Sequence, residues 1–302
     1  MNKARKAFFS LIGPCFSSKC LLNIELKIHI YRTFICPIIR SGLSAFVISD
    51  RLMDSLNIFH RKSLKGFLNV SKRCASPGLY FILGEAPLDA KIHKDIFSLF
   101  YLIWTNPRSK LHEIIKYILN NMGCVSRTWC KYVKNICQQY GIVNPAILMK
   151  QNPPSKSSFK KDIETRIISF HEKEQRNKAK NIKRMKYFNV SIIGLSNKCH
   201  PALLNINSSE DVKRSRFHIK MLLGDLYTYQ TKSIQSGGDP HCILCLKRGE
   251  KSEESICHIL ICCQTYTEIR NVYLKKYEEL LHFSKFNFNT IKYESTITNS
   301  LE

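Results

Sequence analysis

Acidic residues are scarce in this sequence. Its 302 residues include 23 Asp and Glu against 47 Lys and Arg, and the formal net charge at pH 7 is +24. That excess is larger than solubility requires, so we expect a polyanionic partner. The basic residues are spread among aromatics along the whole length, with no amphipathic anchor or lipidation signal. RNA or DNA is therefore favoured over a membrane surface as the partner.

Long apolar runs are also missing. Pro37 and Arg40 interrupt the stretch from Phe34 to Ile48, and no run reaches the roughly 18 apolar residues that a membrane span needs. Near the N-terminus, Gly13 and Pro14 break a short apolar stretch, and no cleavage pattern of small residues follows. We expect an intracellular protein, in the nucleus or the cytoplasm, with no membrane partner and no small-molecule substrate.

Strand signals are few and internal repeats are missing, whereas helical spacing recurs. Apolar residues at intervals of three and four predict helices over Glu25–Cys36, Arg51–Leu68, Ser76–Leu83, Asp89–Trp104 and Thr128–Tyr140. Pro37 is expected to end the first helix, and Gly84 and Gly141 to end the third and the fifth. The predicted fold is mainly α, with a helical N-terminal domain.

A stretch rich in proline and serine divides the chain. Residues 152–161 read Asn-Pro-Pro-Ser-Lys-Ser-Ser-Phe-Lys-Lys, and the prolines and serines prevent a continuous helix there. We expect a helical domain over 1–151, a linker and a basic helix over 152–195, a small C-terminal module over 196–288, and a tail over 289–302. The basic helix, over Asp162–Lys186, is expected to be solvated.

The end of that helix is a candidate surface for phosphates. It places six basic residues within eleven positions that hold no acidic residue: Arg176, Lys178, Lys180, Lys183, Arg184 and Lys186. Tyr187 and Phe188 follow and are candidates for stacking on bases; the alternative is that these aromatics turn back into the core. We predict nonspecific phosphate contacts from the six basic side chains.

The most specific pattern lies near the C-terminus. Cys242 and Cys245 form a C-x-x-C turn, which directs two thiolates at one tetrahedral ion, and His258 follows. Cys262 and Cys263 compete for the fourth position. A step of four residues puts Cys262 on the helical face of His258, whereas Cys263 needs the helix to begin or unwind locally. Helical geometry alone slightly favours Cys262.

Sulfur and imidazole ligands together favour zinc. Four protein ligands leave no open position for water or substrate, so the Zn²⁺ is expected to be structural and the module to be zinc-binding. The other interpretation is a set of reduced, buried side chains without a metal. A disulfide framework is not favoured, because 13 cysteines is an odd number and their spacing is irregular. Most others are expected in the core, among them Cys15, Cys20, Cys36 and Cys74.

This segment resembles the zinc-binding segment at the C-terminal end of LINE-type, non-LTR retrotransposon reverse transcriptases. The resemblance rests on the C-x-x-C pair, a Glu-rich spacer, a histidine followed by x4 and a cysteine, and two later residues, namely Cys242, Cys245, His258, Cys263, Tyr266 and Arg270. It implies Cys263 as the fourth ligand.

The rest of the chain resembles, more diffusely, the region after the polymerase palm that serves as thumb and connection. Arg216–Asp225 is similar to the basic helix and glycine that precede the zinc segment in the family, so Arg216 and Lys220 are further candidates for phosphate contact. Tyr31-x5-Pro37-x4-Gly42, Leu56–Leu68 and Leu79–Pro87 are similar to parts of the thumb and connection.

The catalytic part of such an enzyme is missing. An RNA-directed DNA polymerase of this family needs an aromatic-x-Asp-Asp motif to hold two magnesium ions, and no Asp-Asp pair occurs in this sequence. The resemblance therefore implies a fragment of a retrotransposon reverse transcriptase that is not an enzyme by itself. It would hold template RNA or target DNA nonspecifically, and the rest of a reverse transcriptase is a further candidate partner.

Two other functions compete with this one. A zinc-scaffolded protein-interaction module would carry its positive charge incidentally, and the salt dependence of binding would distinguish it. A magnesium-dependent nuclease could use Pro87–Lys91 with Glu25–Lys27, although such triplets arise by chance in a lysine-rich chain.

Neither His112 nor His171 extends to His-Glu-x-x-His, which excludes that class of metalloprotease, and both are expected at the surface. The pattern of a zinc deaminase is also missing.

Overall fold

The structure is a computed structural model that describes residues 2–11, 22–121, 128–182, 185, 188, 194–195, 198–203, 206 and 208–283. Within these ranges the regular structure is helical, and the only paired extended backbone is an isolated antiparallel bridge between His241 and Glu253. The prediction of a mainly α fold is confirmed. None of the described helices is both long and apolar enough to cross a membrane. The chain divides into a first unit, residues 1–225, and a second unit, residues 226–302.

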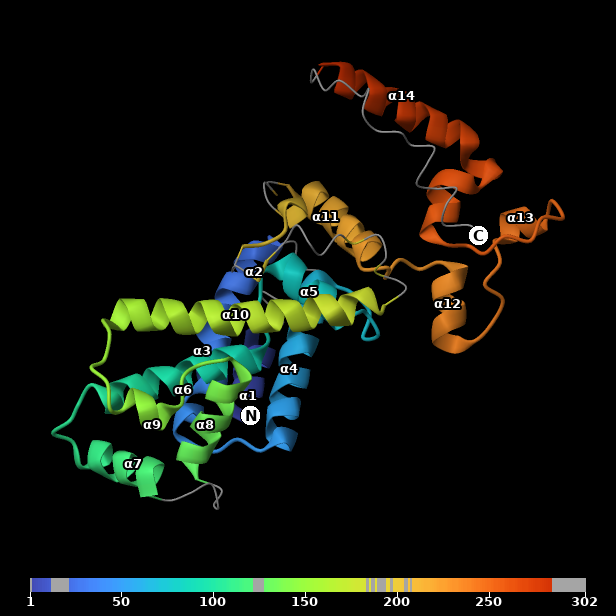
Figure 1. Cartoon of the computed structure of the whole chain (residues 1–302). Coiled ribbons are helices and arrows are strands. Elements are labelled where there is room, and N and C mark those ends of the chain that lie inside the picture. Colours follow the sequence, from blue (N-terminus) through green and yellow to red (C-terminus); the bar gives the residue numbers. More distant parts are fainter. Residues whose placement is uncertain are drawn as a thin grey trace. The chain divides into compact units, whose positions relative to one another are not determined.

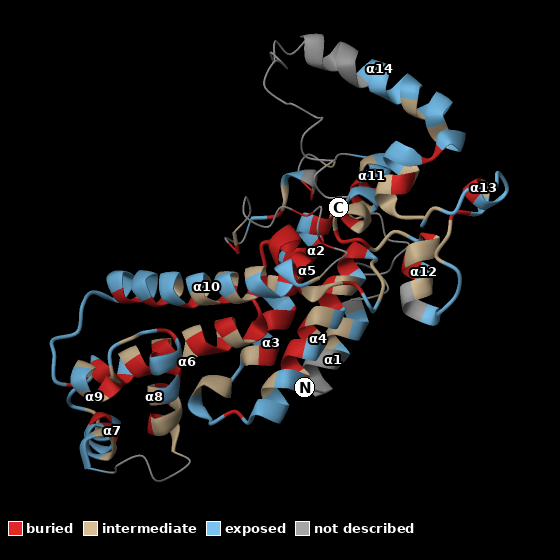
Figure 2. Cartoon of the chain, turned by 45° about the vertical axis from the view of Figure 1, so that its right-hand side comes forward, coloured by how far each residue is buried: buried red, intermediate tan, exposed pale blue. Residues whose placement is uncertain are grey.

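The first unit is a set of helices packed around α5 and α6 (Figure 1). Its elements are α1 (Asn2–Leu11), α2 (Ile24–Ile30), η2 (Tyr31–Ile35), α3 (Cys36–Arg40), η3 (Leu43–Ala45), α4 (Asp50–Leu68), α5 (Ser76–Leu83), α6 (Leu88–Trp104), α7 (Lys110–Asn121), α8 (Trp129–Gln139), α9 (Pro145–Leu148), α10 (Lys156–Lys180), η5 (Pro201–Leu203) and α11 (Ser209–Leu222). Nearly all of α5 and about half of α6 are buried, and α4 and α10 pack against both (Figure 2).

Local signals set the ends of several helices where the sequence predicts them. The Ser49 side chain caps α4, and Thr128 caps α8 by accepting a hydrogen bond from the backbone of Lys131. Gly84 ends α5 at φ +57°, a conformation that favours glycine. A Cβ at this position would also overlap the backbone of Lys198. Gly84 is therefore required both by its own backbone and by the chain that passes beside it.

The helix that begins near Glu25 does not end at Pro37, so that prediction is wrong. Helical structure continues from α2 through the π turn η2 into α3, which ends at Arg40. Pro37 falls in the first turn of α3, directly after the widened turn, where the missing N–H and the ring of a proline are tolerated. The helical segment ends instead before Gly42, at φ +77°.

Helix α10 begins inside the stretch that the sequence assigns to a linker. The Ser155 side chain caps it, and six buried residues follow at intervals of four: Phe159, Ile163, Ile167, His171, Gln175 and Ala179. This face packs on α5 and α6, so the expectation of a solvated helix is wrong for one of its sides (Figure 2). Because of this packing, the boundary predicted near residue 155 falls inside the first unit, which continues to residue 225.

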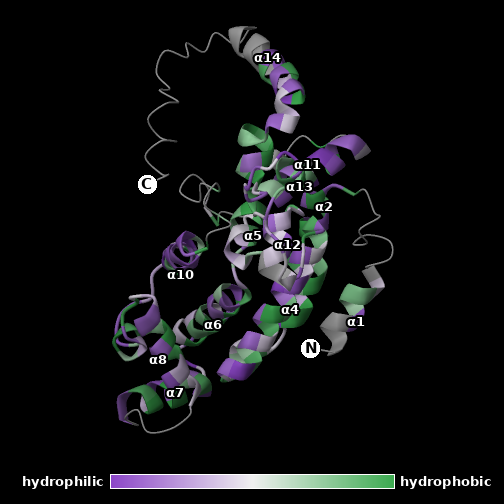
Figure 3. Cartoon of the chain, turned by 90° about the vertical axis from the view of Figure 1, so that its right-hand side faces the viewer, coloured by the Kyte–Doolittle hydropathy of each residue, from purple (hydrophilic) through white to green (hydrophobic). Residues whose placement is uncertain are grey.

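The second unit contains α12 (Tyr229–Ser236), α13 (Ile243–Leu246), η6 (His258–Cys262), η7 (Gln264–Tyr266) and α14 (Thr267–Phe283). Its buried apolar cluster consists of three cysteines, with Leu244 and Tyr266 packed against them. Figure 3 shows hydrophobic and hydrophilic residues mixed along α14. Such a small cluster buries little apolar surface for the stabilisation of a fold. The tail predicted over 289–302 lies outside the described residues.

The net charge is divided unequally between the two units. Residues 226–302 hold nine Lys and Arg and nine Asp and Glu, whereas residues 1–225 hold 38 and 14. The first unit therefore carries the whole net charge of +24, and the second unit is neutral.

Candidate metal centre

Four side chains of the second unit meet in one place. They are Cys242, Cys245, His258 and Cys263, all buried, and one ligand atom from each lies within 4.8 Å of the other three. The Sγ of Cys245 is 3.3 Å from Nε2 of His258 and 3.8 Å from Sγ of Cys263. Among the described residues, no other group of three or more Cys, His, Asp or Glu is so arranged. This tetrad could hold a metal ion.

The first two cysteines lie at the start and the end of a tight turn. The backbone N–H of Cys242 donates to Ser252 O at 2.8 Å, and this hydrogen bond closes the loop from Cys242 to Ser252. The carbonyl of Cys245 accepts hydrogen bonds from the N–H groups of Arg248 and Glu250, at 2.9 and 3.0 Å. Gly249 lies between these donors with φ +78°, which few other residues adopt without strain. The turn thus directs both thiols to the same side.

A π turn supplies the other two members of the tetrad and decides between the competing cysteines. Within η6 the N–H of Cys263 donates to His258 O at 2.7 Å, so residues five apart are stacked. Cys263 is buried beside His258, whereas Cys262 is exposed and outside the tetrad. The preference for Cys262 from helical geometry is wrong, because the chain makes the local widening that Cys263 requires.

Two arginines support the tetrad. Nη2 of Arg248 lies 3.7 Å from Sγ of Cys245 and places a positive charge beside the thiols. The guanidinium of Arg270 donates to Leu260 O at 2.7 Å and to Cys263 O at 2.8 Å, and so fastens the π turn to α14. Groups that orient ligands in this way affect metal affinity without touching the ion.

The thiols differ in how readily they lose a proton. Burial opposes ionisation of Cys263, but hydrogen bonds with Thr265, Cys245 and Cys242 outweigh it and lower its pKa below the usual range. Burial raises the pKa of Cys245, Arg248 opposes that rise, and the two neighbouring thiols add to it. Because metal ligands must be deprotonated, we expect metal affinity to fall as the pH falls.

The candidate phosphate contacts on α10 are partly engaged with neighbours. Arg176 lies over the ring of Phe81, at 5.5 Å, and 3.7 Å from the carboxylate of Glu172. Lys178 pairs with Glu174 at 2.6 Å. Each acidic partner lies four residues before its cation and just outside residues 176–186, the stretch without acidic residues. The count of charges within that stretch therefore gave no sign of these pairs. The Lys178–Glu174 pair is exposed, and such pairs stabilise by only about 0–1 kcal/mol, so Lys178 stays available to phosphate, whereas Arg176 is half-buried.

The remaining basic candidates are placed less uniformly. Lys180 is exposed at the end of α10, while Arg216 and Lys220 are half-buried in α11. Phe188 is buried in the core, so of the two alternatives for this residue the return to the core is confirmed. The other residues of this stretch lie outside the described residues: Lys183, Arg184, Lys186 and Tyr187.

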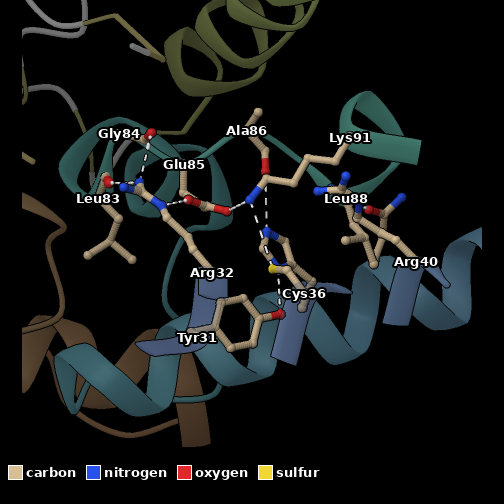
Figure 4. A network of polar contacts seen from close by, with 12 residues as sticks. Tyr31, Arg32, Cys36, Arg40, Leu83, Gly84, Glu85, Ala86, Leu88 and Lys91 are labelled. Carbon is tan, nitrogen blue, oxygen red and sulfur yellow. Dashed lines mark hydrogen bonds and ion pairs between the residues drawn. The ribbon is translucent and has the colours of Figure 1, made fainter. Parts of the chain in front are cut away.

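A buried polar network occupies the place of the nuclease candidate (Figure 4). The fully buried carboxylate of Glu85 pairs with Arg32 at 2.6 Å and with Lys91. Burial lowers the pKa of Lys91 to about 8. Asp89 accepts a hydrogen bond from the backbone of its neighbour Ala90. Within the described part of the chain, no group of three or more potential metal ligands includes a carboxylate.

Buried histidines are a second feature that sequence reasoning missed. Nδ1 of His60 lies 2.8 Å from the hydroxyl of Tyr31. The hydroxyl of Tyr140 lies 2.7 Å from His93 and 2.9 Å from His171. The expectation that His112 and His171 lie at the surface is wrong, because both are buried. Each partner comes from a distant segment, so no local pattern could have revealed these bonds.

No family model, curated protein or solved structure matches the chain.

Proposed function

We propose that this chain binds RNA or DNA nonspecifically through its first unit and that a structural zinc ion holds its second unit together. The observation that carries the proposal is the distribution of charge. All +24 charges of the net excess belong to residues 1–225, which is far more than solubility requires. A nucleic acid is the polyanion that such a surface attracts most strongly, because binding releases its condensed counterions.

The geometry of the tetrad supports zinc. Bonds of about 2.3 Å to sulfur and about 2.0 Å to nitrogen in a tetrahedron place two sulfurs about 3.8 Å apart and a sulfur and a nitrogen about 3.5 Å apart. The corresponding separations from Cys245 are 3.8 Å to Cys263 and 3.3 Å to His258. Three thiolates and one imidazole fill all four positions, so the ion would be structural and without access to substrate.

Zinc would also replace the core that the second unit lacks. A structural zinc contributes about 10–16 kcal/mol of apparent free energy, which equals or exceeds the usual stability of a domain, about 5–15 kcal/mol. The three cysteines, Leu244 and Tyr266 form too small a cluster to supply a comparable term. Metal content by mass spectrometry tests this part. We expect one zinc per chain, lost in Cys242→Ser and in Cys263→Ser and kept in Cys262→Ser.

The resemblance to the region that follows the palm in LINE-type reverse transcriptases suggests which protein the chain derives from. The chain would be a fragment of such an enzyme that has no polymerase activity alone and that holds template RNA or target DNA. The rest of a reverse transcriptase would be its partner. The likeness rests on the order C-x-x-C, His and Cys together with the basic segment Arg216–Asp225 before it.

Fluorescence anisotropy with a labelled single-stranded RNA and a labelled DNA duplex tests the binding. If about 6–10 phosphates are neutralised, affinity should fall by about 10³–10⁵ between 50 and 200 mM salt. Replacing Lys178 and Lys180 by Gln should weaken binding and reduce the salt dependence. The matched control removes two exposed lysines from the neutral unit, Lys247→Gln with Lys251→Gln, and should leave both unchanged. Affinity that does not depend on salt would contradict the proposal.

A protein-interaction module is the second candidate, and one observation favours it for the second unit. That unit has no net charge, and α14 exposes Ile269, Val272 and Tyr273 at helical intervals. Binding of a protein partner through these residues would hardly depend on salt, so the same titration distinguishes the two functions.

A further inference from the structure

Two cysteines of the second unit have no part in the tetrad. Cys257 directly precedes the ligand His258, and Cys262 directly precedes the ligand Cys263. Cys262 is exposed and Cys257 is half-buried, whereas the other described cysteines are buried. A thiol that solvent reaches is open to oxidation in a way that the buried thiols are not.

The π turn brings these two thiols together. Residues five apart are stacked in η6, which places Cys263 beside His258. Cys257 and Cys262 are related by the same step of five, one residue earlier. The side chain of Cys262 makes a hydrogen bond with that of Cys257, so the two thiols are close neighbours.

We propose that Cys257 and Cys262 form a reversible disulfide that clamps the π turn and holds the metal ligands in place. The part of this inference that concerns the metal rests on the proposed zinc centre. The formation of the bridge itself rests only on the position and exposure of the two thiols.

Hydrogen peroxide is a sufficient oxidant for this step. The exposed Cys262 thiol reacts with one peroxide molecule to give a sulfenic acid and water. The Cys257 thiol then attacks that sulfur, the S–S bond forms, and a second water leaves. The two cysteines together lose two hydrogen atoms. A thiol reductant returns both to the reduced state.

The bridge should make metal release slower. A π turn is a rare conformation that the chain adopts at a cost, and it presents both His258 and Cys263. A covalent bond between residues that only this turn brings together disfavours the alternative conformations of the loop. The oxidised chain should therefore transfer zinc to a coloured chelator several-fold more slowly than the reduced chain.

Peptide mapping of the full, zinc-loaded chain tests the bridge. After treatment with one equivalent of peroxide, the chain is denatured with a chelator, alkylated and digested with trypsin. The peptide from Ser252 to Arg270 contains Cys257, Cys262 and Cys263. We expect it to have lost two hydrogen atoms and to carry one alkyl group, on Cys263. Three alkylated cysteines, or a bridge that includes Cys263, would overturn the inference.

Variants separate this inference from the proposed function. Cys257→Ser and Cys262→Ser should each abolish the bridge and keep one zinc per chain, whereas Cys263→Ser should lose zinc. A chain without zinc that still forms the bridge would refute the zinc centre and leave the bridge standing. Zinc release that is as fast or faster after oxidation would refute the clamp, because the bridge would then not favour the conformation that binds the metal.

Discussion

At the scale of single residues, buried charged and polar side chains connect the helices of the first unit. Glu85 has no exposure to solvent and is compensated by Arg32 and Lys91, while Arg32 also donates to Leu83 O and Gly84 O at 3.1 and 3.2 Å. These contacts tie α2–η2 to the end of α5 and the start of α6. A buried carboxylate is tolerated only with such partners.

Neutralising the Glu85 carboxylate should lower the free energy of unfolding. Glu85→Gln leaves the cations of Arg32 and Lys91 without their common anion, and breaking a buried pair in this way costs about 3 kcal/mol. Urea unfolding should show a lower midpoint. Asp95→Asn is the matched control, because the Arg40–Asp95 pair is 30% exposed on each side and should contribute less than about 1 kcal/mol. Equal midpoints for the two variants would contradict the assigned role of Glu85.

Stability should also depend on pH through two buried histidines. Burial, followed by the charge of Lys91, lowers the pKa of His60 to about 3, and burial lowers the pKa of His93 to about 4. Both folded values lie below the unfolded value of about 6.5, so their full contribution is present above that pH and is lost as the pH falls toward 4. Each loses up to about 1.4 kcal/mol per pH unit in that window. Thermal unfolding at pH 7, 6 and 5 measures this, and a constant midpoint would exclude it.

At the scale of elements, local signals predict some features and tertiary packing decides others. Apolar spacing, with Gly141 as the expected end of α8, predicts α4 and α8 closely, because those signals act within the helix. The buried face of α10 was missed because its stripe includes His171 and Gln175 and lies among charges. The π turn of η6 carries no local signal, and Glu85 and Arg32 are 53 positions apart in the sequence. The tetrad could be predicted because the spacing of its cysteines and its histidine is typical of residues that bind one metal ion.

The packing of α10 leads to a prediction about that helix. Ile167 is completely buried on the face toward α5 and α6, so Ile167→Ala should destabilise the first unit by about 2–5 kcal/mol. Lys173→Ala, on the exposed face of the same helix, is the control and should change stability by no more than about 0.5 kcal/mol. Chemical denaturation compares them. Similar stability of both variants would mean that α10 is solvated on all sides, as the sequence first suggested.

At the scale of the whole molecule, the net charge and the candidate metal site belong to different parts of the chain. The first unit holds a large apolar core and the entire net charge, whereas the second unit holds the tetrad and is neutral. The stability of the second unit and the proposed binding of nucleic acid should therefore respond to different treatments. High salt should weaken binding without unfolding either unit, and metal removal should unfold the second unit without abolishing binding.

Treatment with a strong chelator tests the metal dependence of the second unit and the nucleic-acid binding of the first unit in one experiment. The second unit, deprived of the ion that we propose to replace its core, should lose the helices α12 and α14, and its loops should become sensitive to protease. The first unit should remain helical by circular dichroism and retain most of its affinity for RNA, because the lost part contributes no net charge. An unchanged spectrum and digestion pattern would mean that the tetrad is not built around a metal. Loss of RNA binding together with the metal would place part of the nucleic-acid surface in the second unit, against the division of roles inferred from charge.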